Sequence, residues 1–176
     1  MTISINYKNS PYKKKPSNLV LFIDEKFNIS NIRKHITGPE YLFISDMIKT
    51  MSPKDKILSF DIHSKRKIIL VSFKKNQSSS NAENLGAKFY DQIKDLRQSE
   101  YNVNSDCVPS SFKNLIGNFL HGIKLKSYTF EKYKTKKNNK NISIIVTGKN
   151  KPTSKEQLKF KAIEEGTFYT RDLVSE

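Results

Sequence analysis

The feature that most constrains the fold is an apolar run, Leu-Val-Leu-Phe-Ile, at residues 19–23. The run has the length of a β-strand and is bounded by residues that are common in turns. A strand with one solvated face alternates apolar and polar residues, whereas a strand without polar positions is buried on both faces. We therefore expect a sheet that is covered on both sides.

Strands and helices alternate along the rest of the chain. Alternating or apolar stretches predict further strands, the first at a sheet edge and the next two joined as a hairpin: residues 2–7, 57–62, 67–73, 101–107 and 142–146. Helical spacing of apolar residues predicts four helical regions: residues 28–52, 81–98, 112–123 and 154–176. This order predicts one three-layer α/β/α domain with a mixed, mostly parallel sheet.

The clearest helix follows the Pro-Ser pair at residues 109–110. One apolar stripe has helical spacing there: Phe112, Leu115, Ile116, Phe119, Leu120 and Ile123. Gly117 and Gly122 lie in the same segment, and no phosphate-binding loop motif surrounds them. We expect these two glycines to allow close helix packing.

Three residues are expected to cap helices at their N-termini, namely Ser30, Asn81 and Ser154. Gln157 stands three residues after Ser154, which is the spacing of a capping box. In the first helical region a Gly-Pro pair at residues 38–39 interrupts the pattern. A second helix then carries Leu42, Phe43, Met47, Ile48 and Met51.

The net charge of +15 comes mainly from lysine, because only four of the 32 basic residues are arginine. Arginine is the usual residue for bidentate contacts to bases and phosphates. We therefore favour a solvated basic surface. The alternative is weak, salt-sensitive nucleic-acid binding through the lysine-rich loops at residues 13–15 and 132–140.

No secretory signal is recognisable at the N-terminus, and no apolar run has the length of a membrane-spanning helix. The single cysteine, Cys107, has no partner for an internal disulfide and is expected to be a small core residue. These features predict a cytoplasmic protein without a membrane partner.

The sequence contains no recognisable catalytic or metal-binding constellation. His35, His63 and His121 are far apart and lack metal-ligand spacings, so we expect surface or partly packed histidines. No GxSxG elbow and no glycine-rich nucleotide loop is present. The acidic pairs are expected to be solvated or paired with lysines: Asp24-Glu25, Asp91 with Asp95, and Glu164-Glu165.

Two segments resemble the N-terminal domain of the leucyl aminopeptidase (cytosol aminopeptidase) family. The first is GIKLKSYTFEKYKTKK at residues 122–137, which is similar to the family's S-Y-x-F-[DE]-K-Y-[KR]-T segment. The second is EGTFYTRDLVSE at residues 165–176, which is similar to the family's interdomain helix. The resemblance implies a macro-like domain at residues 1–153 and an interdomain helix at residues 154–176.

In this family the C-terminal peptidase domain supplies the catalytic residues and two divalent metals, zinc or manganese. The resemblance therefore implies a non-catalytic domain that acts in assembly and substrate access, with no catalytic, cofactor or metal residue of its own. It also implies a cytoplasmic homo-hexamer and a catalytic domain that follows the last helix. That helix lacks a Gly or Asn stop signal, which is expected if the chain continues.

We expect four residues of the last helix to dock onto the peptidase domain: Phe168, Tyr169, Arg171 and Leu173. Tyr128, Phe130 and Tyr133 are expected to pack across the end of the preceding helix. A nucleotide or ADP-ribose pocket is a further alternative, which rests on fold analogy alone and lacks the glycine loops.

Overall fold

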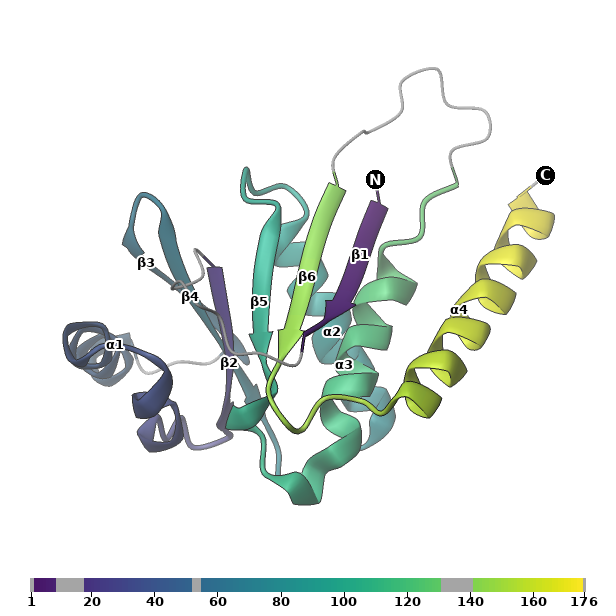
Figure 1. Ribbon diagram of the computed structural model, residues 1–176. Helices are drawn as coiled ribbons and strands as arrows, with labels where there is room; N and C mark the ends of the chain where they lie inside the picture. The colour runs from purple at the N-terminus through teal and green to yellow at the C-terminus, as the bar shows by residue number, and fades with distance from the viewer. Residues whose placement is uncertain (1, 9–17, 52–54, 131–140, 176) are drawn as a thin grey trace.

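A computed structural model describes residues 2–8, 18–51, 55–130 and 141–175 of the chain. Within these ranges it contains six strands: β1 (Thr2–Tyr7), β2 (Asn18–Asp24), β3 (Ile57–His63), β4 (Arg66–Phe73), β5 (Glu100–Asn104) and β6 (Asn141–Thr147). They form one sheet in the order β1-β6-β5-β2-β4-β3 (Figure 1). Only the β3–β4 pair is antiparallel, so the prediction of a mixed, mostly parallel sheet is confirmed.

Four α-helices accompany the strands: α1 (Gly38–Met51), α2 (Ser79–Ile93), α3 (Lys113–Lys126) and α4 (Ser154–Ser175). Short 3₁₀ helices precede α1 and α3 and follow β5: η1 (Ser30–His35), η2 (Ser105–Cys107) and η3 (Ser110–Phe112). None of the described helices is long and apolar enough to cross a membrane.

Helices cover both faces of the sheet. Phe22 of β2 packs edge-to-face on Phe119 of α3, with ring centroids 5.3 Å apart. Because successive strand residues point to opposite faces, Leu21 and Ile23 face the other side. They are fully buried there, where η1 and α1 supply their own buried isoleucines, Ile32 and Ile44. The three-layer α/β/α prediction is therefore confirmed.

Two glycines let α2 and α3 cross in close contact. A Cβ on Gly86 of α2 would lie 1.9 Å from the carbonyl oxygen of Phe119, and one on Gly122 of α3 would lie 2.0 Å from that of Glu83. No side chain fits at these distances, so the backbones meet directly. The predicted packing role of Gly122 is confirmed. Gly117 has a different neighbour, Phe160 of α4.

The apolar stripe on α3 is also confirmed, because its residues from Leu115 to Ile123 are buried. The predicted break at residues 38–39 is confirmed, because η1 ends at His35 and α1 begins at Gly38. The apolar residues of α1 do not share one face. Ile44 is fully buried, whereas Leu42 is 64% and Met51 51% exposed.

All three predicted N-caps are wrong by one to three residues. Ser30 is the first residue of η1, whose N-cap position is Ile29. The side chain of Ser78, three residues before Asn81, accepts the N–H of Asn81 and caps α2. Thr153 precedes Ser154 and forms a capping box with Glu156, whose Oε2 accepts the Thr153 N–H at 2.7 Å.

Candidate functional site

The long helix α4 lies beside α3 at the β1 edge of the sheet (Figure 1). None of its described side chains is fully buried, although it spans 22 residues. A helix of this length in a domain usually buries one continuous apolar face. Instead, α4 is held by two separate groups of contacts, with a groove between them.

The first group of contacts, clamp 1, lies near the start of α4. The Phe160 ring packs on the imidazole of His121 from α3, with ring centroids 5.0 Å apart. The ring also covers Gly117, where a Cβ would lie 2.7 Å from Cε2 of Phe160. A side chain at position 117 would push the aromatic ring away, so Gly117 allows α4 to approach α3.

The second group, clamp 2, joins the end of α3 to the last turns of α4. The Tyr128 ring packs on Phe168 with centroids 5.3 Å apart, and its hydroxyl donates to Asp172 Oδ1 at 2.6 Å. The Arg171 guanidinium lies over the same ring and donates to the Leu125 carbonyl at 3.0 Å. Tyr128 therefore packs as a bridge to α4, a contact between segments that lie far apart in the sequence.

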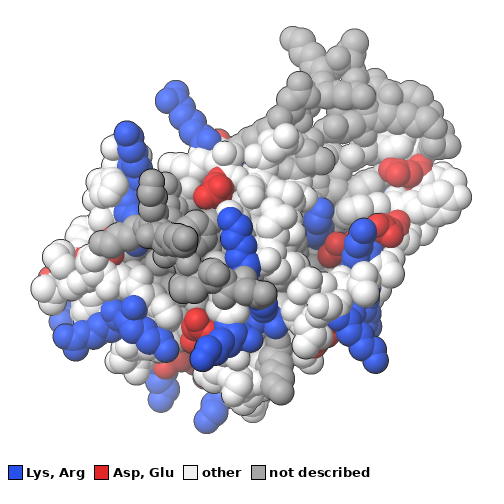
Figure 2. Space-filling model, in the orientation of Figure 1, with Lys and Arg blue, Asp and Glu red and all other residues white. Residues whose placement is uncertain are grey.

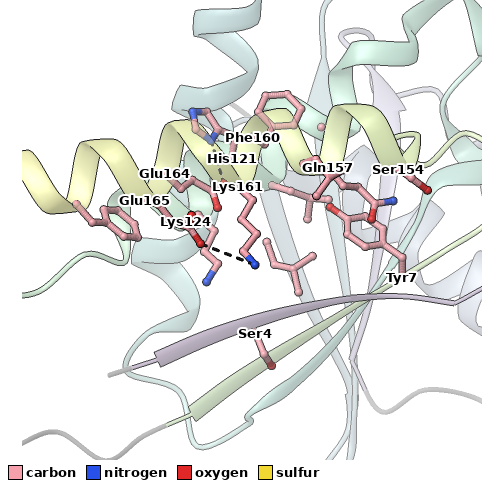
Figure 3. A pocket seen from close by; sticks show the side chains of 15 residues that line it. Ser4, Tyr7, His121, Lys124, Ser154, Gln157, Phe160, Lys161, Glu164 and Glu165 are labelled. Carbon is pink, nitrogen blue, oxygen red and sulfur yellow. Dashed lines mark hydrogen bonds and ion pairs between the residues drawn. The ribbon is translucent and has the colours of Figure 1, made fainter.

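Between the clamps lies a groove of about 730 Å³, bounded by α3, α4 and β1. Side chains from all three elements line it (Figure 3). Its walls are partly apolar, with Ile5, Leu120 and Phe160 among the lining residues. Pockets of this volume accommodate small molecules. The chemistry of the few polar groups in such a pocket determines which class of molecule binds.

A histidine–glutamate pair closes one side of the groove. His121 Nδ1 lies 2.9 Å from Glu164 Oε1, and both side chains are largely buried. This contact corrects an expectation from the sequence, because Glu164 is paired with a histidine where a lysine partner was expected. Its neighbour Glu165 does lie near a lysine, at 3.8 Å from Lys161 Nζ. The Lys161–Glu165 pair is exposed and is drawn at the front of the groove in Figure 3.

Two further polar groups enter the groove from β1 and α3. Burial raises the pKa of Tyr7 to about 12, and the nearby Glu164 carboxylate adds to the shift, so the phenol stays protonated at neutral pH. Among the described residues none forms a hydrogen bond with its hydroxyl. Lys124 Nζ donates to the Ile3 carbonyl at 2.6 Å, which fixes the ammonium next to the sheet edge.

The four predicted docking residues lie on two different faces of α4. Phe168 and Arg171 point toward the domain and belong to clamp 2. Tyr169 and Leu173 point away from it and are 66% and 55% exposed. We define the outer face of α4 by its exposed large apolar residues that do not line the groove: Ile163, Tyr169, Leu173 and Val174.

The remaining candidate residues do not converge. Asp91 pairs with Lys94 at 2.9 Å and with Lys126 at 3.4 Å, as expected for a carboxylate near lysines. His35 contacts the Asn104 amide, and His63 lies at the end of β3, the edge strand opposite β1, whereas His121 lies on α3. In the described part of the chain, no three His, Cys, Asp or Glu side chains are placed to share a metal ion.

The described surface does not gather its lysines into one patch on the visible face. Figure 2 shows basic side chains spread over that face with acidic ones between them. The lysine-rich loops at residues 13–15 and 132–140 and the aromatic Tyr133 lie outside the described residues. Nucleic-acid binding through these loops stays a prediction.

The inner face of α4 is the part of the site that the sequence analysis missed. Its residues recur at helical spacing: Gln157, Phe160, Glu164, Phe168 and Arg171. The pattern is hard to recognise because it mixes aromatic and charged residues, while a second apolar pattern marks the outer face. The partners, Tyr7 and His121, belong to segments far away in the sequence.

No protein-family model matches the sequence, and no curated protein does. Solved structures match at low sequence identity. A mutant of tomato leucine aminopeptidase is 15% identical with a TM-score of 0.75, covering 99% of this chain and 38% of that one. Cytosol aminopeptidase from Coxiella burnetii is 13% identical with a TM-score of 0.56, covering 97% of this chain and 33% of that one.

A third similar structure is a separate domain. The macrodomain of Thermus aquaticus DarG is 8% identical with a TM-score of 0.55, and the match covers 84% of this chain and 99% of that one. The chain thus corresponds to a whole macrodomain but spans less than two fifths of either aminopeptidase. At these identities the likeness concerns the fold alone, and the fold is macro-like α/β.

Proposed function

We propose that the chain is a non-catalytic, accessory N-terminal domain of a leucine-type metallo-aminopeptidase, acting in assembly and substrate access. The structural likeness supports this proposal because it extends over 99% of the chain and therefore includes α4. Fold alone does not determine function, so the proposal needs a feature of this chain's own surface.

The outer face of α4 is the observation that carries the proposal. Tyr169 and Leu173 lie about one helical turn apart on one side of the helix, and each is more than half exposed. Exposed apolar residues in a contiguous stripe are typical of surfaces that bind another protein domain. Neither Tyr169 nor Leu173 lines the groove, so a second domain can reach this side of α4 without entering it.

The proposed occupant of the outer face is the peptidase domain of the same enzyme. Under the proposal that domain holds two divalent metals, zinc or manganese, and the catalytic residues, and the whole enzyme is a cytoplasmic hexamer. Phe168 and Arg171 then act indirectly, because their contacts with Tyr128 and Leu125 hold α4 in position. Tyr169 and Leu173 make the docking contact.

The test uses the natural protein, tagged at its N-terminus and purified from its own cells. We expect an assembly far larger than the 20.4 kDa of this chain. We also expect hydrolysis of a fluorogenic leucyl substrate that depends on Mn²⁺ or Zn²⁺. A purified protein of 20.4 kDa without leucyl hydrolase activity overturns the proposal.

A pair of variants tests the role of the outer face. The double substitution Tyr169→Ser with Leu173→Ser should reduce the assembled fraction and the activity at least several-fold. Leu42→Ser on α1 is the matched control, because Leu42 is equally exposed but lies on the far side of the domain. Equal losses in both variants would contradict a specific docking face.

A further inference from the structure

The groove between the clamps holds a balanced set of charges. Lys124 from α3 and Lys161 from α4 supply two ammonium groups, while Glu164 and Glu165 supply two carboxylates. Tyr7 adds a protonated hydroxyl from β1. These groups come from three elements and enclose the same space, so a molecule in the groove meets both signs of charge.

Each inward group keeps hydrogen-bonding capacity for a ligand. Glu164 uses Oε1 for His121, which leaves Oε2 as an acceptor. Lys124 uses one of its three donors for the Ile3 carbonyl, which leaves two. The Lys161–Glu165 contact at 3.8 Å is long and exposed, so either partner can turn to a ligand at little cost.

The walls between these charges are apolar. Ile5 and Leu120 lie on the domain side, and Phe160 and Phe168 on the helix side. Both aromatic rings are held in place, because Phe160 packs on His121 and Phe168 on Tyr128. Rings that are already ordered lose little entropy when a ligand packs against them.

We propose that this groove binds a small zwitterion with apolar side chains, of the size and chemistry of an unblocked dipeptide. In this proposal the ligand carboxylate accepts hydrogen bonds from Lys124, Lys161 and the Tyr7 hydroxyl. The ligand ammonium donates to the carboxylates of Glu164 and Glu165. The apolar side chains pack between Leu120 and Phe160, and a volume of about 730 Å³ is sufficient for two residues.

The charge balance argues against other classes of ligand. A phosphate or other simple anion meets Glu164 and Glu165 as well as the lysines. A simple cation meets Lys124 and Lys161. A purely apolar molecule removes water from all four charged groups without replacing its hydrogen bonds, which is costly. Only a ligand with both charges satisfies both sides.

This inference does not depend on the proposed docking function. The groove lies on the inner side of α4, and the docking stripe lies on its outer face. Binding to the isolated 176-residue chain tests the groove, whereas assembly and activity of the natural protein test the docking. Either proposal can therefore fail without the other.

The experiment is isothermal titration calorimetry of the chain with L-leucyl-L-phenylalanine at pH 7. The same peptide with an acetylated N-terminus and the same peptide with an amidated C-terminus are the matched ligands. Each lacks one charge, so we expect each to bind at least about tenfold more weakly than the zwitterion, as for a lost hydrogen bond to a charged group. Inorganic phosphate should not bind.

Protein variants test whether the peptide binds in the groove. Lys161→Met and Tyr7→Phe should each weaken the zwitterion severalfold, whereas Lys159→Met, on an exposed position of the same helix, should not. A circular dichroism melt of each variant establishes that it is folded. Because the ligand series uses the unaltered chain, it stays informative if a variant unfolds.

Several outcomes overturn the inference. The first is the absence of measurable binding with the peptide at millimolar concentration. The second is equal binding of the zwitterion and either blocked peptide, which would indicate a site for one charge only. The third is an equal loss in Lys161→Met and Lys159→Met, which would indicate general electrostatic attraction.

Discussion

Oε1 of Glu40 lies 2.9 Å from Nε of Arg66, and both side chains are buried. The pair joins the first turn of α1 to the first residue of β4. Glu40 Oε2 also accepts the N–H of Thr37 at 2.7 Å. Burial by itself raises the pKa of the Glu40 carboxyl, but the Thr37 N–H and the Arg66 guanidinium outweigh it and lower the pKa below its ordinary value.

Replacing Glu40 by Gln should therefore destabilise the fold in a pH-dependent way. A carboxyl whose pKa is lowered by folding contributes stability above its unfolded pKa, near 4.5, and loses it as pH falls through the folded value. Since the substitution removes the carboxylate from a buried ion pair with Arg66, we expect a loss of about 3 kcal/mol at pH 7. Urea unfolding from pH 7 to pH 3 should show the difference between the proteins shrinking below about pH 4.5.

The control for this pair is Asp46→Asn. Asp46 lies 4.0 Å from Lys49 on the exposed side of α1, so its substitution should change stability by less than about 0.5 kcal/mol at any pH. A Glu40→Gln difference that stays constant from pH 7 to pH 3 would contradict the assigned role of the carboxylate.

Gly122→Ala should destabilise the protein strongly. A Cβ there would lie 2.0 Å from the Glu83 carbonyl oxygen, so α2 and α3 must separate to admit it. The expected loss is about 3 kcal/mol, at the upper end for overpacking. Gly166→Ala in α4 is the control, because nothing lies within 4 Å of its Cβ and alanine is the better helix former by about 1 kcal/mol. Urea unfolding should move the two variants in opposite directions.

Phe160→Ala should loosen α4 without unfolding the sheet. The substitution removes clamp 1, and only clamp 2 and the smaller contacts then hold the helix. Hydrogen exchange followed by mass spectrometry should show faster exchange in peptides from α4 and little change in β2 or β4. Leu158→Ala, at a position 68% exposed, should leave exchange in α4 unchanged. Faster exchange throughout the sheet would show that clamp 1 stabilises more than α4.

Cys107 should react very slowly with thiol reagents while the protein is folded. Burial raises the pKa of its thiol to about 12, so at pH 8 almost none of it is the reactive thiolate. The residue is also closed off from solvent, being 4% exposed. Ellman's reagent should modify the native chain at least a hundredfold more slowly than the chain in guanidinium chloride. Rapid modification of the native protein would show that η2 opens readily.

The local periodicity of the sequence was enough to predict most of the sheet and the main helices. The apolar run at residues 19–23 is the centre of β2, and the hairpin and the edge strand were expected from alternation alone. Helix starts were harder to predict, because several neighbouring residues can act as caps. Ser78 competes with Asn81, and Thr153 with Ser154, and only the backbone conformation distinguishes them.

The groove was harder to predict than the fold because its parts come from distant segments. The sequence singled out Phe168, Tyr169, Arg171 and Leu173 as one group, since all four lie near the end of α4. Which of them faces the domain depends on Tyr128, and that contact exists only once α3 and α4 are side by side. Apolar residues on two sides of one helix do not reveal which side meets its own domain.

The pairing of β1 with β6 has a consequence for the order in which the molecule is made. Thr2 pairs with Asn141, so the ribosome releases β1 long before β6, its neighbour among the described strands, exists. Until then the strand that contains Ile3 and Ile5 has no partner strand. Its backbone N–H and C=O groups stay unpaired in the nascent chain, which favours aggregation. This edge of the sheet can therefore form only after β6 has been synthesised, so β1 must wait for a strand that follows it by most of this domain.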